Sequence, residues 1–406
     1  MKEKKKKNKK WVLRRHAIIT SLARSFFAFV VKAKTHVKVQ KFDNRKGGPY
    51  LILYNHQTAY DQFFVGMATK GAVYYVATED IFSMGFVSKL LKYAVNPIPI
   101  KKQTADVKAI MTCLRVAKEG GTICLAPEGN RTYSGRTEYI NPSIVPLAKK
   151  LGMPIALFRI EDGYGVQPRW SDKFRKGKMR AYVSRVIQPN EYSQMSNDEL
   201  YKAICDELYV DEAKVTGTFK HRNKAQYLER ALYVCPNCGL SDLYSHKDEI
   251  TCPKCRTTAI YTDTKQLVGK DCDFPFEFVR DWYDYQADYI NSFNPLAHTA
   301  IPLYTEDVDL SEVIPYKKKK SICKKCLIEL YGHAVTVNTT KECLEFPFAQ
   351  TSAITVLGRN KLNIYFDGKI YQIKGDKRFN ALKYVHLYHR HKNITKGDEN
   401  GKFLGL

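Results

Sequence analysis

Apolar positions between residues 47 and 190 fall into short β-like runs separated by amphipathic, helix-like stretches. The β-like runs are rich in β-branched and aromatic residues and cover 50–54, 73–77, 95–100, 122–126, 154–160 and 179–187. The intervening stretches, such as 105–118, carry apolar residues at helical spacing. This alternation predicts an α/β sheet with surrounding helices. Ser196 followed by Glu199 is a capping box, which predicts a further helix to about Asp211.

The pattern becomes β again from about residue 304. Apolar and polar residues alternate over 362–366, Asp367-Gly368 supplies a two-residue hairpin turn, and an apolar run returns. The last stretch, 378–391, has helical spacing. Several strands closed by one terminal helix predict a small, mostly-β, barrel-like domain. Three histidines near its end are interpreted as a solvated face rather than a metal site: His386, His389 and His391.

Four cysteines have the spacing of a metal site. Cys235 and Cys238 form one Cys-x2-Cys pair, and Cys252 and Cys255 form a second pair after thirteen intervening residues. Two such pairs bring four thiolates to one tetrahedral metal, which predicts a structural zinc ribbon with no open coordination position. Removal of the metal is then expected to unfold the region 233–300 and to spare the α/β half. A pair of disulfides is the alternative.

The compartment argues against that alternative. No small-x-small cleavage signal follows the first apolar stretch, so we expect a reducing cytoplasm, in which disulfides are rare. A third pair, Cys323 and Cys326, has no matching pair, and we interpret it as strand or loop cysteines rather than a second metal site. Residues 213–232 are polar and basic, which predicts a linker or a connecting helix. The aromatic-rich stretch 273–293 predicts a helix packed on the ribbon.

The positive charge is concentrated at the N-terminus. The 406 residues hold 66 Lys and Arg against 41 Asp and Glu, a net charge of +25, of which +14 lies in residues 1–46. Residues 2–10 are almost pure lysine and are expected to be disordered by self-repulsion. An amphipathic stretch, 16–34, follows. Arg24 interrupts its apolar run and leaves it short of the roughly 20 residues of a membrane span.

A basic amphipathic helix behind a lysine tail is typical of a helix lying on an anionic membrane surface. The alternative is an ordinary helix packed on its own domain. Hydrophobic residues make up 44% of the chain, which excludes disorder throughout. Net charge alone does not separate lipid ligands from nucleic acid. The ribbon itself, 235–255, has two lysines against three acids, and this local charge argues against nucleic acid.

Two polar motifs directly follow apolar runs, where ligands of open α/β sheets bind. His56 follows the first run, and Asp61 can accept its Nδ1–H and leave Nε2 as a base if His56 lies in a turn and Asp61 one turn into a helix. Glu128-Gly129-Asn130-Arg131 follows a later run. Gly129 permits a tight turn, and Arg131 can hold a phosphate with its planar guanidinium. A chance His–Asp pair and an ordinary surface turn are the alternatives.

Together the two motifs resemble those of the glycerolipid acyltransferase family, which includes the lysophosphatidate acyltransferases. That family carries H-x4-D, matched by His56 and Asp61, and then P-E-G-x-R, matched through Arg131. Between them it has an apolar strand ending in a basic residue, and here Lys102 stands where arginine is usual. Its last block is an apolar strand opened by proline, which Pro154 matches. The resemblance covers about residues 10–215.

The resemblance implies direct transfer of an acyl group from acyl-CoA or acyl-carrier protein to the free hydroxyl of lysophosphatidic acid, giving phosphatidic acid for phospholipid synthesis. No covalent nucleophile and no catalytic cofactor are implied. The catalytic residues are then His56 and Asp61. The substrate-binding residues are Glu128, Gly129, Arg131, Lys102 and Pro154. Because Asn130 and Thr132 depart from the commoner Thr and Ser, another lysophospholipid or an amino-lipid stays open as the acceptor.

The predicted organisation has four parts: a basic tail and membrane-surface helix (1–46), an acyltransferase domain (47–215), a linker with zinc ribbon and aromatic helix (216–300), and a β-rich domain (301–406). The last two resemble accessory modules, the final one of pleckstrin-homology type. We expect a peripheral protein on the cytoplasmic face of the cell membrane that contacts anionic lipid and no nucleic acid. A zinc-ribbon nucleic-acid-binding protein and a catalytically dead lipid-binding scaffold are the less favoured alternatives.

Overall fold

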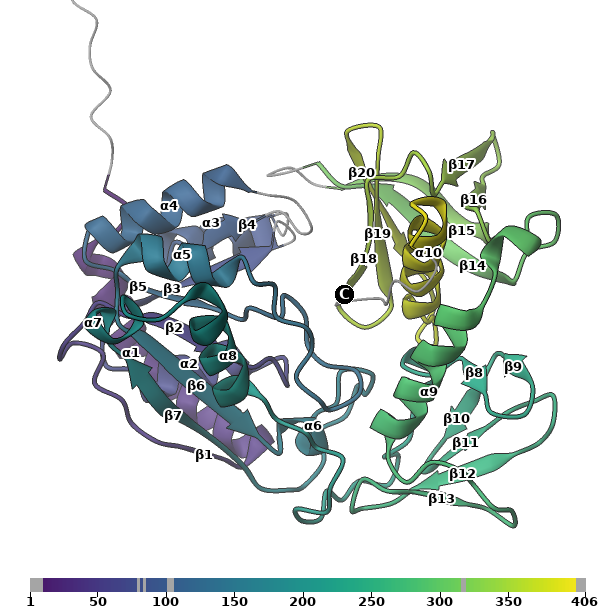
Figure 1. The fold of residues 1–406 in the computed structure, drawn as a ribbon, viewed down its shortest axis with the longest axis horizontal. Coiled ribbons are helices and arrows are strands. Elements are labelled where there is room, and N and C mark those ends of the chain that lie inside the picture. Colours follow the sequence, from purple (N-terminus) through teal and green to yellow (C-terminus); the bar gives the residue numbers. More distant parts are fainter. Residues whose placement is uncertain (1–9, 79–80, 83–84, 101–105, 315–318, 399–406) are drawn as a thin grey trace, which may run out of the picture.

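The structure, a computed structural model, describes residues 10–78, 81–82, 85–100, 106–314 and 319–398. An α/β region forms one side of the molecule and two β-rich regions form the other (Figure 1). The lysine-rich residues 1–9 and the predicted site residue Lys102 lie outside the described residues.

Seven strands form the sheet of the α/β region, in the order β1-β7-β6-β2-β5-β3-β4. Their bounds are β1 (Val37–Val39), β2 (Leu51–Tyr54), β3 (Val73–Thr78), β4 (Ile98–Ile100), β5 (Thr122–Leu125), β6 (Ile155–Glu161) and β7 (Met179–Ile187). The five strands from β6 to β4 in this order are parallel to one another, whereas β7 is antiparallel to β6. All six predicted β-like runs are therefore strands of one sheet.

Helices cover both faces of this sheet (Figure 1). They are α1 (Arg14–Thr35), α2 (Asp61–Ala68), α3 (Phe86–Ala94), α4 (Val107–Lys118), α5 (Ile144–Leu151), α6 (Gly163–Val166), α7 (Pro189–Tyr192) and α8 (Asn197–Leu208). Alternate residues of a strand point to opposite faces. Leu51 and Leu53 of β2 accordingly join a core with α4, α5 and α8, while Ile52 and Tyr54 join a second core with α1 and α2. A central strand buried on both faces is typical of a parallel sheet.

The helix α1 packs on the α/β region through Val31 and Arg24 and leaves much of its apolar side exposed. The Arg24 guanidinium donates hydrogen bonds to the carbonyls of Gly66, at 3.1 Å, and Lys70, at 2.8 Å. On the opposite side Leu22 is 76% exposed and Phe29 is 75% exposed. By length and composition alone, α1 is long and apolar enough to cross a membrane, and it is the one such helix among the described residues. This differs from the expectation that Arg24 leaves the apolar stretch too short.

Two small antiparallel sheets follow, one of β8 and β9 and one in the order β10-β11-β12-β13. Their bounds are β8 (Val234–Cys235), β9 (Gly239–Leu240), β10 (Tyr244–His246), β11 (Glu249–Thr251), β12 (Thr258–Tyr261) and β13 (Leu267–Gly269). The helix α9 (Val279–Ser292) packs on β8, and its Trp282 Nε1 donates to the Val234 carbonyl at 2.7 Å. It begins later than predicted because Pro275 disfavours helical conformation in the residue before it.

Residues 213–232 do not form the predicted connecting helix. They hold one short 3-10 turn, η2 (Leu228–Arg230), and they bury Phe219 and Leu232. Phe219 packs in the core of the α/β region, whereas Leu232 packs in the core of the β-rich regions. This segment therefore joins two cores, although its polar composition suggested a solvated linker.

The C-terminal region is a seven-stranded antiparallel sheet in the order β17-β16-β15-β14-β20-β19-β18, which curls around one helix (Figure 1). Its elements are β14 (Tyr304–Glu312), β15 (Lys320–Leu330), β16 (Ala334–Asn338), β17 (Cys343–Pro347), β18 (Ala353–Leu357), β19 (Lys361–Phe366), β20 (Lys369–Lys374) and α10 (Leu382–Thr395); a 3-10 turn, η3 (Pro295–Ala297), precedes them. The turn Asp367-Gly368 joins β19 to β20 as predicted, with positive φ at both residues. The prediction of a mostly-β, barrel-like domain is confirmed.

One prediction for this region is wrong. The histidines of α10 do not form a solvated face, since His386 and His391 are buried and the Nδ1 of His386 bonds the Tyr233 hydroxyl at 2.6 Å. Helix α10 is enclosed by the curled sheet and by α9, which a helical-spacing argument on one segment does not reveal. Cys323 and Cys326 are strand cysteines of β15, in line with their prediction as strand or loop cysteines, and a disulfide joins them.

Candidate active site

The loop between β2 and α2 brings His56 and Asp61 together. The Nδ1 of His56 lies 2.8 Å from the Oδ2 of Asp61. Asp61 is the first residue of α2, not one turn into it, and its carboxylate also accepts hydrogen bonds from the backbone N–H groups of Gln57 and Thr58 and from the Thr58 hydroxyl. The loop therefore wraps around this carboxylate, which is itself fully buried.

This contact determines which nitrogen of His56 can act as a base. A carboxylate only accepts hydrogen bonds, so Nδ1 carries the proton and Nε2 is left with its lone pair. The side chain of His56 is 21% exposed, which leaves the ring open to a ligand. Burial lowers the pKa of His56 below its ordinary value; Asp61 opposes this shift, while the charges of Arg131 and Arg169 add to it. The imidazole is therefore neutral near pH 7.

Glu128 ties the loop after β5 to the loop after β2. Its carboxyl group accepts the backbone N–H of His56 and the backbone N–H of Glu138, each at 2.7 Å. Burial raises the pKa of Glu128 well above its ordinary value. Both contacts are made to backbone groups of the two loops, so they support a role of Glu128 in shaping the turn rather than in orienting Arg131. Gly129 follows with φ of +71°, a backbone conformation that glycine adopts without strain.

Arg131 lies beside the histidine with an unused donor. The backbone N–H of Thr132 donates to the carbonyl of His56 at 3.0 Å, which holds the two loops side by side. Within the described part of the chain, the buried Nη1 of Arg131 has no hydrogen-bond partner. Burial, together with the charges of Arg169 and Arg359, lowers the pKa of Arg131 to about 9. An anion bound at this guanidinium would satisfy both the donor and the charge.

Two arginines at this site were not found from the sequence. Arg169 lies between α6 and β7 and is 2% exposed, and its Nη1 donates to the Arg131 carbonyl at 2.8 Å. Arg359 comes from the turn between β18 and β19 in the C-terminal region, and the Nε of Arg169 donates to the neighbouring Gly358 carbonyl at 3.4 Å. Neither arginine belongs to a recognisable motif, and the second is 228 residues beyond Arg131, so only the folded structure reveals them.

Pro154 is not part of this site. It precedes β6, and its carbonyl accepts a hydrogen bond from the N–H of Leu51 at the start of β2. Since β2 and β6 are parallel, Pro154 lies at one end of the sheet and His56, which follows β2, lies at the other. The structure thus brings together His56, Asp61, Glu128, Gly129 and Arg131 but leaves Pro154 apart.

The sequence of this region matches known proteins. Residues 36–160 match the family model for acyltransferases. The chain is 20% identical over 136 residues to a 1-acyl-sn-glycerol-3-phosphate acyltransferase of Bacillus subtilis (strain 168), a match that spans 34% of this chain and 65% of that protein. Over this stretch the chain is therefore similar to the acyltransferase family, as its motifs predicted. The matched stretch contains His56 and Arg131 and ends within β6, before Arg169 and Arg359.

Two solved structures are also similar to parts of this chain. The crystal structure of the LPA acyltransferase PlsC from Thermotoga maritima aligns with a TM-score of 0.40 at 20% identity, covering 48% of this chain and 76% of that chain. The solution structure of the N-terminal PH domain of human ARAP2 aligns with a TM-score of 0.21 at 9% identity, covering 25% of this chain and 89% of that chain.

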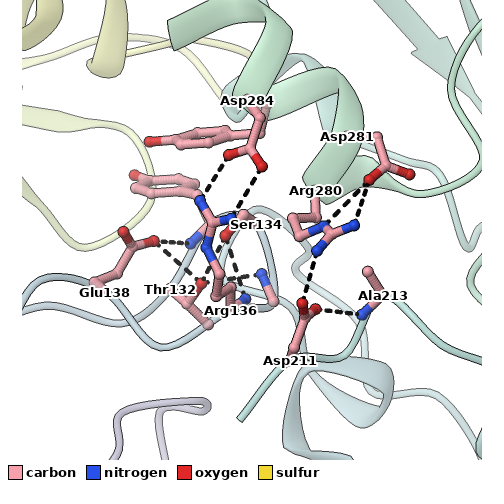
Figure 2. A network of polar contacts seen from close by, with 12 residues as sticks. Thr132, Ser134, Arg136, Glu138, Asp211, Ala213, Arg280, Asp281 and Asp284 are labelled. Carbon is pink, nitrogen blue, oxygen red and sulfur yellow. Dashed lines mark hydrogen bonds and ion pairs between the residues drawn. The ribbon is translucent and has the colours of Figure 1, made fainter. Parts of the chain in front are cut away.

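The loop that carries Arg131 is bound to α9. Figure 2 shows Arg136 pairing with Asp284 of α9, with N···O distances of 3.0 and 2.6 Å. A second ion pair joins Arg280 of the same helix to Asp211 at 2.8 Å. The Oε1 of Glu138 accepts the Thr132 hydroxyl at 3.1 Å within the loop (Figure 2). The helix that packs on the ribbon therefore also holds the segment that carries Arg131.

The four predicted metal ligands lie together. The Sγ atoms of Cys235, Cys238, Cys252 and Cys255 all lie within 4.8 Å of one another. Tetrahedral zinc, with Zn–S bonds of about 2.3 Å, separates its sulfur ligands by roughly 3.8 Å. Two of the sulfur–sulfur distances here are 3.6 and 4.0 Å. The four cysteines thus fit a metal ion of this geometry.

Proposed function

We propose that this protein transfers a fatty acyl group from an acyl thioester to the free hydroxyl of lysophosphatidic acid, giving phosphatidic acid. The observation that carries the proposal is the pair of His56, whose Nδ1 is 2.8 Å from Asp61, and Arg131, whose buried Nη1 lacks a partner among the described residues. A neutral imidazole and an unsatisfied guanidinium side by side suit a substrate that carries both a hydroxyl and a phosphate.

In the proposed reaction, the Nε2 of His56 takes the proton of the acceptor hydroxyl. The oxygen then attacks the thioester carbonyl carbon, the C–S bond breaks, and the imidazolium returns its proton to the leaving thiolate. Asp61 keeps the proton on Nδ1 and stabilises the imidazolium. General-base assistance of this kind is worth on the order of 10² to 10⁴ in rate.

A direct transfer is favoured over a covalent intermediate. Cys124 of β5 is the cysteine close to the site along the strand that precedes Glu128. Burial raises the pKa of Cys124 well above its ordinary value, so this thiol carries no thiolate near neutral pH. The thioester donor, acyl-CoA or acyl-carrier protein, is therefore proposed to react with the acceptor itself.

We also propose that α1 and α3 rest on an anionic membrane at the cytoplasmic face. The apolar stripe of α1 continues on α3, where Phe86 is 78% exposed and Leu90 is 53% exposed. The two helices are neighbours, since the Arg15 guanidinium lies 4.4 Å from the ring centre of Tyr93. An outward apolar surface beside basic residues suits a peripheral helix. Because Arg24 is bound to α2 and the loop after it, the surface orientation is favoured over a span.

The membrane proposal is tested by vesicle flotation of the full chain. Replacing Leu22 and Phe29 together with serine should reduce the fraction bound to vesicles containing phosphatidylserine, because burial of apolar area is worth about 25 cal/mol per Å². A double serine replacement at the exposed Val215 and Tyr244, which lie outside α1 and α3, is the matched control. Equal binding by both variants would contradict the proposal.

The four-cysteine group is proposed to hold structural zinc. Zinc with four thiolate ligands supplies no open position for water, so it contributes fold stability and no step of the reaction. The proposed ligands of the ion are Cys235, Cys238, Cys252 and Cys255. Gly239, which follows Cys238, lies against α9: an added Cβ there would lie 2.4 Å from the Tyr289 hydroxyl, so a larger residue would not fit.

The acceptor is tested directly with the purified full-length protein. It is incubated with acyl-CoA or acyl-carrier protein against a panel of lysophosphatidic acid, other lysophospholipids and amino-lipids, and the products are identified by mass spectrometry. The proposal expects phosphatidic acid as the main product. A preference for a lysophospholipid with a head group, or for an amino-lipid, would establish the alternative acceptor instead. Absence of any acylated product would overturn the enzyme assignment.

A further inference from the structure

Three arginines from distant parts of the chain lie in contacting segments near His56. Arg131 comes from the loop after β5, Arg169 from the segment before β7, and Arg359 from the turn between β18 and β19. Both Arg169 and Arg359 act electrostatically on Arg131. Only Arg131 belongs to the stretch that matches the acyltransferase family. The other two were assigned no role by the sequence motifs.

Among the described residues, the acids near this cluster offset its charge only in part: Asp61 acts electrostatically on Arg131 but forms no ion pair with it. The hydrogen bonds of Arg169 go to uncharged acceptors, namely the carbonyls of Arg131 and Gly358 and the side chain of Asn130. Arg359 has one carboxylate, Asp172, at 3.1 Å, and it shares this carboxylate with another arginine. That arginine is Arg230, which binds Asp172 at 2.7 Å.

One carboxylate thus serves two arginines, and the described residues supply no ion pair to Arg131 or Arg169. Buried positive charges without counterions are costly. The cluster as a whole therefore has an excess of positive charge and, at the Nη1 of Arg131, an unsatisfied donor. These are the properties of a site that is completed by a bound anion of high charge density.

We infer that Arg359 of the C-terminal region completes, together with Arg169 and Arg131, the binding site for the acceptor's phosphate group. The inference rests on the proposed function and deepens it, since the catalytic site would then be incomplete without the C-terminal sheet. A phosphomonoester carries close to two negative charges, so it suits three guanidinium groups better than a phosphodiester with one. The cluster would thereby select acceptors with a terminal phosphate.

The donor also carries phosphates when it is acyl-CoA, but these do not fit this position. In lysophosphatidic acid, two carbons and one ester oxygen separate the reacting hydroxyl oxygen from the phosphorus, so the phosphate stays beside His56. In acyl-CoA the whole pantetheine arm separates the thioester from the phosphates. Since the charges of Arg131 and Arg169 both act on His56, the cluster is close to the reacting atoms and suits the acceptor.

The test compares variants of the full-length protein. Arg359→Ala should raise the KM for lysophosphatidic acid at least tenfold, leave the KM for acyl-CoA within twofold, and reduce the preference for lysophosphatidic acid over monoacylglycerol, which has the same hydroxyl without phosphate. Arg359→Lys should recover part of the loss. Lys369→Ala, which removes an exposed charge from the far end of β19–β20, is the matched control and should behave as the wild type.

The variant Asp172→Asn tests whether Arg359 only docks the C-terminal region and does not bind the phosphate. This variant removes the ion pair that docks Arg359 but keeps its charge, so it should not raise the KM for lysophosphatidic acid, whereas a docking role predicts the same loss in both variants. An unchanged KM for lysophosphatidic acid in Arg359→Ala, or an increase confined to acyl-CoA, would overturn the inference.

A binding measurement distinguishes failure of the inference from failure of the proposed function. Glycerol 3-phosphate should raise the thermal unfolding midpoint of the wild type and of Lys369→Ala, and the shift should be lost in Arg359→Ala. If this holds but no lysophospholipid is acylated, the anion site stands and the proposed function fails. If lysophosphatidic acid is acylated but the shift is absent or independent of Arg359, the proposed function stands and the inference fails.

Discussion

The ring and the backbone of His56 are each held by a hydrogen bond to a buried carboxyl group. Asp61 binds its ring nitrogen, and Glu128 binds its backbone N–H. The ring therefore has little freedom to rotate. Preorganisation of this kind is what a general base needs, because the proton must be taken at a fixed position.

The charges around His56 predict the pH dependence of catalysis. Burial lowers the pKa of His56 below 6.5. The charges of Arg131 and Arg169 also lower this pKa, whereas Asp61 raises it. Only the neutral imidazole can accept a proton, so kcat/KM should rise with pH through this pKa and be level above it. The acid limb should therefore lie below pH 6.5, as measured by initial rates between pH 4.5 and 8 with folding checked at each pH. An acid limb above pH 7 would contradict this assignment.

At the scale of elements, the segment that carries Arg131 is held by a helix of another region. The Arg136–Asp284 pair joins it to α9, and Glu128 joins it to the loop of His56. The sequence motifs did predict the strands, the capping box of α8 and the approach of His56 to Asp61, since each depends on neighbouring residues. They could not predict the Arg136–Asp284 ion pair or the approach of Arg359 to the site, because each brings together residues more than a hundred positions apart.

Removal of the Arg136–Asp284 pair should lower activity more than stability. Both side chains are partly exposed, so the pair is worth about 0–1 kcal/mol to unfolding. Arg136→Ala should nevertheless reduce kcat severalfold, because the loop of Arg131 loses its contact with α9. The charge-reversed double variant Arg136→Asp with Asp284→Arg should recover activity. Lys202→Ala, which removes an exposed ion pair from α8, is the control. If Arg136→Ala and Lys202→Ala changed kcat equally, α9 would not be what holds the loop of Arg131 in place.

At the scale of the whole molecule, the two halves share one site. The stretch that matches the acyltransferase family model ends at residue 160, yet α9 binds the loop of Arg131, and the turn between β18 and β19 binds Arg169, which also contacts that loop. The composition could not indicate that the two halves share a site. Most of the +25 charge belongs to the N-terminal 46 residues, and the arginines of the site are spread over the rest of the chain. The polar segment 213–232, which resembled a linker, buries residues in both cores.

This arrangement changes what metal removal should do. Structural zinc binding is worth roughly 10–16 kcal/mol in small finger peptides, so chelation should unfold the ribbon. Because α9 packs on the ribbon and binds Arg136, acyl transfer should fall as well, whereas the sequence suggested that the α/β half would be spared. Metal content and kcat are measured together for the wild type, for Cys238→Ser and for the control Cys272→Ser, whose cysteine is exposed and outside the cluster. Unchanged kcat in a metal-free protein would contradict the coupling.

The central claim is that His56 activates the acceptor hydroxyl for acyl transfer. The most direct measurement is the rate of phosphatidic acid formation from lysophosphatidic acid and acyl-CoA, followed by mass spectrometry, for the wild type, His56→Ala and the control His246→Ala, whose histidine is exposed on β10. The account predicts that His56→Ala loses on the order of 10²-fold or more in kcat with an unchanged unfolding midpoint, and that the control retains wild-type rates. Wild-type turnover by a folded His56→Ala variant would contradict it.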